Sequence, residues 1–249
     1  MTRHQPRRDA GRFVVPHSAL VIDTCQDARP PDDVSSTLAF ALADFADALA
    51  AYDRMESSED SETREAICVE VVSACPAAPA RAGACPSVFD VVVVGMGTAP
   101  SENADGQHAE ELAGILASLP VRQNAAVYGM MAAMTSPSAT TDGLDALAAA
   151  CPRAGLAWAG GLVLEATPLA TTLPGLTRMG GSRRPVSECV DDLICALRSG
   201  LSVADAARLF SWQTGGTDEA SPSVLRARWG WPLRLRTFLR AQRGRTSQR

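Results

Sequence analysis

The chain has 249 residues, of which 46% are hydrophobic and 20% are charged, and this composition excludes general disorder and predicts one domain, or one domain with an appendage. Its 23 Lys-plus-Arg residues are all Arg, so this chain contains no Schiff-base lysine, P-loop lysine or lysine general base. The net charge of −5 is unevenly divided, because residues 221–249 carry eight Arg and no acidic residue, whereas the remainder carries 15 Arg against 28 acidic residues, a net charge of −13.

Five short apolar segments, rich in Val, Ile, Leu or Gly, are predicted to be β-strands. The third of them reads FDVVVVG, and a continuous run of Val is typical of a strand that is buried on both faces of a parallel sheet. In chain order, the predicted strands are residues 18–23, 66–73, 89–95, 124–131 and 155–164.

Segments with apolar residues at three- and four-residue spacing follow most of these strands and are predicted to be amphipathic helices. The first helix has Ser35 or Ser36 as its expected N-cap. The predicted helices are residues 35–54, 108–119, 141–153 and 185–198. Because strands alternate with helices, the sequence predicts an α/β fold with a doubly wound, five-stranded parallel sheet.

The charge distribution and the strand pattern divide the chain into three regions. We expect an N-terminal arm at residues 1–17, the sheet domain at residues 18–200, and an Arg-rich helical extension outside the sheet at residues 201–249. Docking of this extension on the acidic body, within one chain or between subunits of a homo-oligomer, is the favoured explanation because the charges are complementary. A peripheral contact of residues 221–249 with an anionic membrane surface is the alternative, and the nucleic-acid signal is weak.

The cysteines and the apolar segments bear on the compartment. The seven Cys form neither a C-x-x-C pair nor a close Cys/His group, so no metal site is predicted. No segment approaches 18 uninterrupted apolar residues, and no apolar run of signal-peptide length follows the Arg-rich N-terminus. We therefore expect a cytoplasmic protein whose Cys are reduced and mostly buried.

Ligands of open parallel sheets bind beyond the carboxyl ends of the strands, so the loops at those ends form the candidate site. After the first strand, the hydroxyls of Ser35, Ser36 and Thr37 stand at a helix start. Backbone N–H groups at such a place hold a phosphate or, as the commoner alternative, the hydroxyls simply cap the helix. Asp32 and Asp33 precede them and would repel a phosphate dianion unless their side chains turn outward.

Small residues follow the third and fourth predicted strands. Gly95, Gly97 and Thr98 allow a flat ligand to approach the backbone, or simply permit a turn. Gly129 and Met130 lie near a strand end and would offer an apolar ligand face, although Met in such a place is more often part of the core. The sequence has no G-x-S-x-G, Walker A or G-x-G-x-x-G motif, so no catalytic residue is assigned.

Four segments carry a family resemblance: the first strand with its Ser-Ser-Thr-Leu-Ala helix start, FDVVVVGMGTAP, GLAWAGGLVL, and PVSECVDDLICALRSG. Together they resemble the flavodoxin-like superfamily, in particular NAD(P)H-dependent FMN reductases and flavodoxin-family oxidoreductases. The resemblance spans roughly residues 18–200, and it implies a flavodoxin-like sheet.

The resemblance implies an FMN-binding oxidoreductase or electron carrier that uses NAD(P)H and in which the flavin supplies the chemistry. The phosphate would lie in the loop after the first strand, and the isoalloxazine ring between the loops after the third and fourth strands. The usual G-S-x-R or T-G-x-T phosphate signature is absent, so the alternative is a non-catalytic binding or regulatory module that uses its basic C-terminal segment for a partner or a membrane surface. The implied cofactor-binding residues are Thr24, Ser35, Ser36, Thr37, Gly95, Gly97, Thr98, Ala99, Pro100, Gly129 and Met130.

Overall fold

One parallel β-sheet forms the centre of the protein. The structure is a computed structural model that describes residues 13–24, 32–59, 67–73, 88–97, 105–134, 141–210 and 223–236. The strand order is β2-β1-β3-β4-β5-β6, and all neighbouring strands are parallel. The predicted α/β class and parallel sheet are confirmed, whereas the predicted count of five strands is wrong. The strands are β1 (Ser18–Asp23), β2 (Cys68–Ser73), β3 (Phe89–Met96), β4 (Val121–Ala133), β5 (Ala157–Glu165) and β6 (Val224–Ala227).

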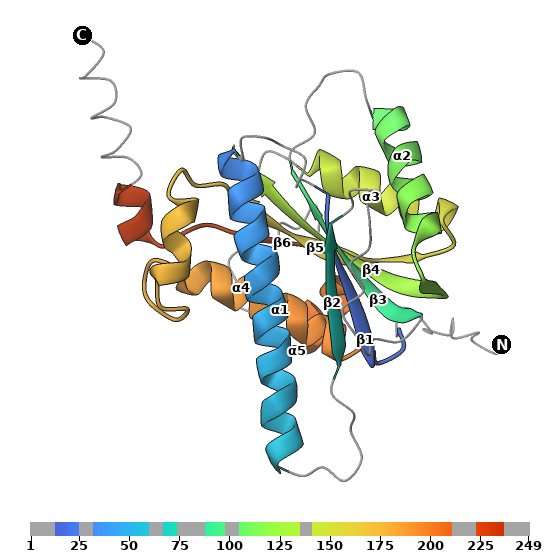
Figure 1. Ribbon diagram of the computed structural model, residues 1–249, viewed down its shortest axis with the longest axis horizontal. Helices are drawn as coiled ribbons and strands as arrows, with labels where there is room; N and C mark the ends of the chain where they lie inside the picture. The colour runs from blue at the N-terminus through green and yellow to red at the C-terminus, as the bar shows by residue number, and fades with distance from the viewer. Residues whose placement is uncertain are drawn as a thin grey trace, which may run out of the picture.

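Helices cover both faces of the sheet (Figure 1). The helices α1, α4 and α5 pack on one face, and α2 and α3 pack on the other, so that two apolar cores lie on opposite sides of the strands. The helices are α1 (Asp33–Glu59), α2 (Asp105–Ser118), α3 (Asp142–Arg153), the 3-10 helix η1 (Ala170–Gly175), α4 (Arg184–Arg198) and α5 (Val203–Phe210), and residues 231–236 form a further helical segment.

The sixth strand comes from the segment that the sequence predicts to be helical and outside the sheet. Residues 224–227 pair in parallel with residues 161–164 of β5, and Leu225 is buried. Helices do occur in the expected extension, at α5 and at residues 231–236. The prediction that the whole extension lies outside the sheet is nevertheless wrong, because the interleaved Arg residues conceal a strand that is only four residues long.

A glycine in β5 allows the C-terminal segment to come this close. Gly160 has a φ of +119°, and a Cβ at this position would lie 2.6 Å from the carbonyl oxygen of Ser223 and 2.7 Å from Cβ of Val203. Both the backbone conformation and the lack of space therefore disfavour any side chain here. Gly160 thus serves the packing of α5 and β6 against β5.

The first helix, α1, begins at Asp33. Its N-cap is Asp32, the residue directly before it, rather than the predicted Ser35 or Ser36. The backbone amide of Ser35 donates a hydrogen bond to Oδ1 of Asp32 at 2.7 Å. The amide of Ser36 donates to the carbonyl oxygen of Asp32 at 3.0 Å. An Asp that accepts the third amide of a helix is one of the strongest caps, so it displaces Ser from this role.

Among the described residues, one helical stretch, Asp33–Met55, is long and apolar enough to match a membrane span by length and composition. Half of its most apolar part is buried inside the structure. Leu38, Leu42 and Phe45 lie in the core against the sheet. The apolar character of α1 is therefore accounted for by its position as a core helix.

Four cysteines are described. Cys151, Cys189 and Cys195 are free, and the first two are buried. Cys68 at the start of β2 is disulfide-bonded. The expectation of reduced cysteines is thus confirmed for three of them and wrong for Cys68.

Replacing Gly160 with Ala is expected to lower the free energy of unfolding by about 2–4 kcal/mol, because the added methyl group forces α5 or β6 away from β5. Gly114→Ala is the matched control, since Gly114 is exposed in α2 and a Cβ there meets nothing within 4 Å. That substitution is expected to stabilise the protein by about 0.5–1 kcal/mol through helix propensity. Urea unfolding measures both changes, and a shift of the same sign and size in the two variants would contradict the close approach at Gly160.

Candidate functional site

The carboxyl ends of β1 and β3 are adjacent at the point where the strand order reverses, which is where open α/β sheets bind their ligands. Both the amide and the hydroxyl of Thr24 donate hydrogen bonds to the carbonyl oxygen of Gly95, at 3.1 and 2.8 Å. Thr24 and Gly97 are partly exposed. These two predicted residues therefore lie at the strand switch and are accessible there.

The three hydroxyl residues predicted to hold a phosphate have different roles in the structure. Ser35 donates to Oδ1 of Asp32 from its amide (2.7 Å) and from its hydroxyl (2.8 Å), and these hydrogen bonds lower the pKa of Asp32. Thr37 is fully buried, and its hydroxyl donates to a carbonyl oxygen one helical turn earlier (2.6 Å) and accepts from the amide of Thr167 (3.1 Å). Ser36 is partly exposed. Because a carboxylate already occupies the anion position at this helix start, Ser35 and Thr37 do not fit a phosphate group in this arrangement.

Gly95, Gly129 and Met130 come together at the same level of the sheet, and all three are used in packing. Met130 lies opposite Gly95 in the register and is fully buried, since β4 continues for three residues beyond it. A Cβ on Gly95 would lie 2.5 Å from the side chain of Leu42, and one on Gly129 would lie 2.5 Å from that of Leu144. The two glycines therefore serve the close approach of α1 and α3 to the sheet.

The remaining predicted residues, Thr98, Ala99 and Pro100, lie outside the described residues. Their contact with a flavin ring stays a prediction. Of the residues that are described, Thr24, Ser36 and Gly97 combine a position at this edge of the sheet with partial exposure.

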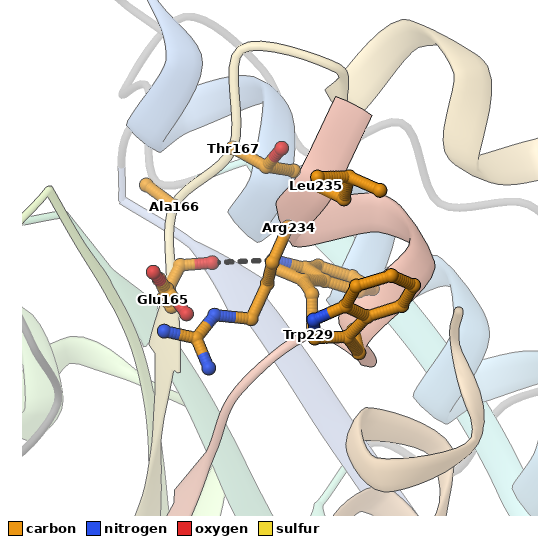
Figure 2. Close-up of a pocket in the computed structure, with 7 residues that line it drawn as sticks. Glu165, Ala166, Thr167, Trp229, Arg234 and Leu235 are labelled. Carbon is orange, nitrogen blue, oxygen red and sulfur yellow. Dashed lines mark hydrogen bonds between the residues drawn. The ribbon is translucent and has the colours of Figure 1, made fainter. Parts of the chain in front are cut away.

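A cavity of about 440 Å³ lies at the same edge, beyond the carboxyl end of β5 (Figure 2). It is lined by Glu165, Ala166, Thr167, Trp229, Trp231, Arg234 and Leu235. Trp229 is 3% exposed, and its indole N–H donates to the carbonyl oxygen of Glu165 at 2.6 Å. Trp231, in contrast, is 71% exposed. The volume falls within the range of small-molecule sites, and two indole rings line the cavity.

Ion pairs and ring contacts hold the C-terminal wall of this cavity against α1. Oδ1 of the buried Asp44 accepts from Nε of Arg178 at 3.1 Å and also pairs with the guanidinium of Arg183. The guanidinium carbon of Arg183 lies 4.6 Å from the ring centroid of Phe40. The rings of Phe40 and Trp229 are 6.3 Å apart between centroids. Asp44 is thus linked to Trp229 through Arg183 and Phe40.

The sequence did not indicate this cavity. Its two Trp belong to the segment predicted to lie outside the sheet, and Glu165 follows directly after the fifth predicted strand. The only local signal is an acidic residue directly after an apolar strand. The contact that forms the site joins Glu165 to a residue 64 positions later, so it depends on the pairing of β6 with β5.

The buried thiols of Cys151 and Cys189 and the buried phenol of Tyr128 are not activated as nucleophiles. Burial raises the pKa of the Cys151 and Cys189 thiols to about 12, so both stay protonated at neutral pH. Burial also raises the pKa of Tyr128, whose hydroxyl donates to the carbonyl oxygen of Leu201 at 2.6 Å. Within the described ranges, no group of three or more His, Cys, Asp or Glu could hold a metal ion.

No family model matches the chain, and no curated protein matches it. Its class follows from the structure: it is an α/β protein with an open, all-parallel sheet of six strands and helices on both faces. Its function is inferred below from the residues at the carboxyl edge of that sheet.

Asp44→Ala is expected to lower the free energy of unfolding by about 3–5 kcal/mol, because it leaves the buried guanidinium of Arg183 without its carboxylate. The exposed pair of Arg184 and Glu188 on α4, 2.7 Å apart, provides the matched control. Glu188→Ala should cost about 0.5 kcal/mol or less. Urea unfolding at pH 7 measures both losses, and a small loss for Asp44→Ala would show that this ion pair does not hold α1 to the cavity wall.

The pKa of Asp192 is raised to about 6 by burial and then by the nearby charges of Asp191 and Glu188, from an ordinary value of 3.8. The folded protein therefore binds this proton more tightly than the unfolded chain, so the contribution of Asp192 to stability is greatest below about pH 4 and is lost as the pH rises through about 6. Asp192→Asn should raise the free energy of unfolding at pH 7 by about 1 kcal/mol, with allowance for solvent screening, and change it little at pH 4. Urea unfolding at the two pH values tests this, and a larger gain at pH 4 would refute it.

Proposed function

We propose that the protein is a flavodoxin-like FMN-binding oxidoreductase or electron carrier that uses NAD(P)H. The observation that carries the proposal is the strand order, because β2-β1-β3-β4-β5 is the flavodoxin-like order, in which the ligand crevice lies where β1 and β3 meet. The sixth strand adds to β5 at the far edge and leaves that crevice unchanged. The resemblance of residues 18–200 to flavodoxin-family oxidoreductases supports the same function.

In this proposal, Thr24, Ser36 and Gly97 are the described residues that border the flavin. The flavin supplies the redox chemistry, and the protein supplies position and electrostatics. A chain without Lys and with three His suits a protein that takes its chemistry from a cofactor. A cytoplasmic location belongs to the same proposal, since pyridine nucleotides are intracellular reductants.

A second function is favoured by the way in which the start of α1 is capped. The carboxylate of Asp32 accepts hydrogen bonds from the amide and the hydroxyl of Ser35. The hydroxyl of Thr37 accepts a hydrogen bond from the amide of Thr167, in the loop after β5. Two of the expected phosphate ligands therefore stabilise the fold instead. These contacts support a non-catalytic binding or regulatory module that has lost the flavin. The basic residues 221–249, of which 224–227 already belong to the sheet, would then contact a second subunit, another partner or an anionic membrane surface.

A titration of the full-length protein with FMN distinguishes the two functions. One FMN bound per chain, seen as quenching of flavin fluorescence, supports the flavoprotein, and NADH or NADPH should then bleach the absorbance of the bound flavin. Lack of binding with FMN in large excess would remove the flavoprotein from consideration and leave the non-catalytic module.

Asp32→Ser is expected to tighten FMN binding by about tenfold, because it removes a negative charge from the start of α1. Ser retains an N-cap, so the free energy of unfolding should change by less than about 1 kcal/mol. Asp47→Ser, at an exposed position further along α1, is the control and should leave FMN binding unchanged. Riboflavin lacks the phosphate, and an equal gain in riboflavin affinity would contradict a phosphate position at Asp32.

A further inference from the structure

The cavity beyond β5 contains an acidic group whose hydrogen-bonding capacity is not used. Glu165 lines the cavity, and its Oε2 is buried and, among the described residues, accepts no hydrogen bond. A carboxylate oxygen shielded from water is unfavourable without a donor. A ligand with cationic N–H groups inside the cavity would neutralise this carboxylate.

Apolar side chains stand around the same carboxylate. The buried indole of Trp229 is fixed by its hydrogen bond to the backbone of Glu165, as Figure 2 shows. Trp231 and Leu235 also line the cavity and are 71% and 37% exposed. Large apolar side chains exposed around a hollow are typical of a binding surface, and indole faces attract cations.

Arg234 is the cationic residue of the lining, and it differs from Glu165 in exposure. Its side chain is exposed and extends toward Glu165 in Figure 2, so water can still solvate the guanidinium. The carboxylate of Glu165 is therefore less well solvated than the guanidinium of Arg234, which favours a cationic ligand over an anionic one.

We propose that this cavity binds a small organic cation with a flat or apolar body, such as an aromatic amine or amidine. The cationic N–H groups donate to the carboxylate of Glu165, and the body lies against the indoles of Trp229 and Trp231. The cavity volume of about 440 Å³ suits a ligand of that size. The site lies at β5 and β6, whereas the proposed flavin crevice lies at β1 and β3, so the two proposals are independent.

Three probes of one shape and different charge test the proposal: benzamidine, the neutral benzamide and the anionic benzoate. Isothermal titration calorimetry of the full-length protein should show benzamidine binding at least about tenfold more tightly than the other two, because it alone makes charge-assisted hydrogen bonds to a carboxylate. Glu165→Gln should weaken benzamidine by about tenfold. Arg234→Gln should strengthen it by about threefold, since a like charge is removed.

Glu111→Gln, at an exposed position on α2, is the matched control and should leave benzamidine binding unchanged. Thermal unfolding of each variant confirms that the fold is kept. Benzamide binding as tightly as benzamidine, or full benzamidine binding by the Glu165→Gln variant, would overturn the proposal. Binding by the Arg234→Gln variant alone would show that Arg234 already satisfies Glu165, and it would also overturn the proposal. Failure of the FMN titration changes none of these outcomes.

Discussion

Both faces of an all-parallel sheet must be shielded from water, because its strands carry apolar side chains on both sides. In this protein β3 is buried along its whole length, and α1 and α3 lie on opposite faces of the sheet. Gly95 and Gly129 have no side chain at the points where Leu42 and Leu144 approach the strands. The small residues near the carboxyl ends of the strands are therefore required for the packing of the helices, whatever ligand the crevice takes.

The same requirement makes the C-terminal segment part of the sheet domain. Trp229 and Leu233 are buried at 3% and 1% exposure, and Trp229 joins the end of β5 to the ring of Phe40 on α1. The Arg-rich composition of this segment is compatible with burial because apolar residues alternate with the Arg residues. Strand pairing with β5 and burial of an indole therefore hold this segment against the sheet within one chain.

The two candidate sites at the carboxyl edge of the sheet differ in whether their polar side chains already have hydrogen-bond partners within the fold. At the strand switch, Asp32 and Thr37 have hydrogen-bond partners within the fold. In the cavity beyond β5, a buried oxygen of Glu165 has none among the described residues. Buried polar groups in native proteins are nearly always paired, so the fold accounts for Asp32 and Thr37, and the unpaired oxygen of Glu165 is the observation on which the proposed cation site rests.

The sequence by itself determined the α/β class and the approximate positions of the first five strands and of the helices between and after them. These features depend on local patterns, such as the Val run of β3 and the spacing of apolar residues in α1. The tertiary structure alone decided that residues 224–227 form a strand, because four residues that include an Arg have no recognisable period. It also decided that Thr37 is bonded to Thr167, 130 residues away, and that Trp229 meets Glu165. Such contacts join distant parts of the chain, and no local pattern contains them.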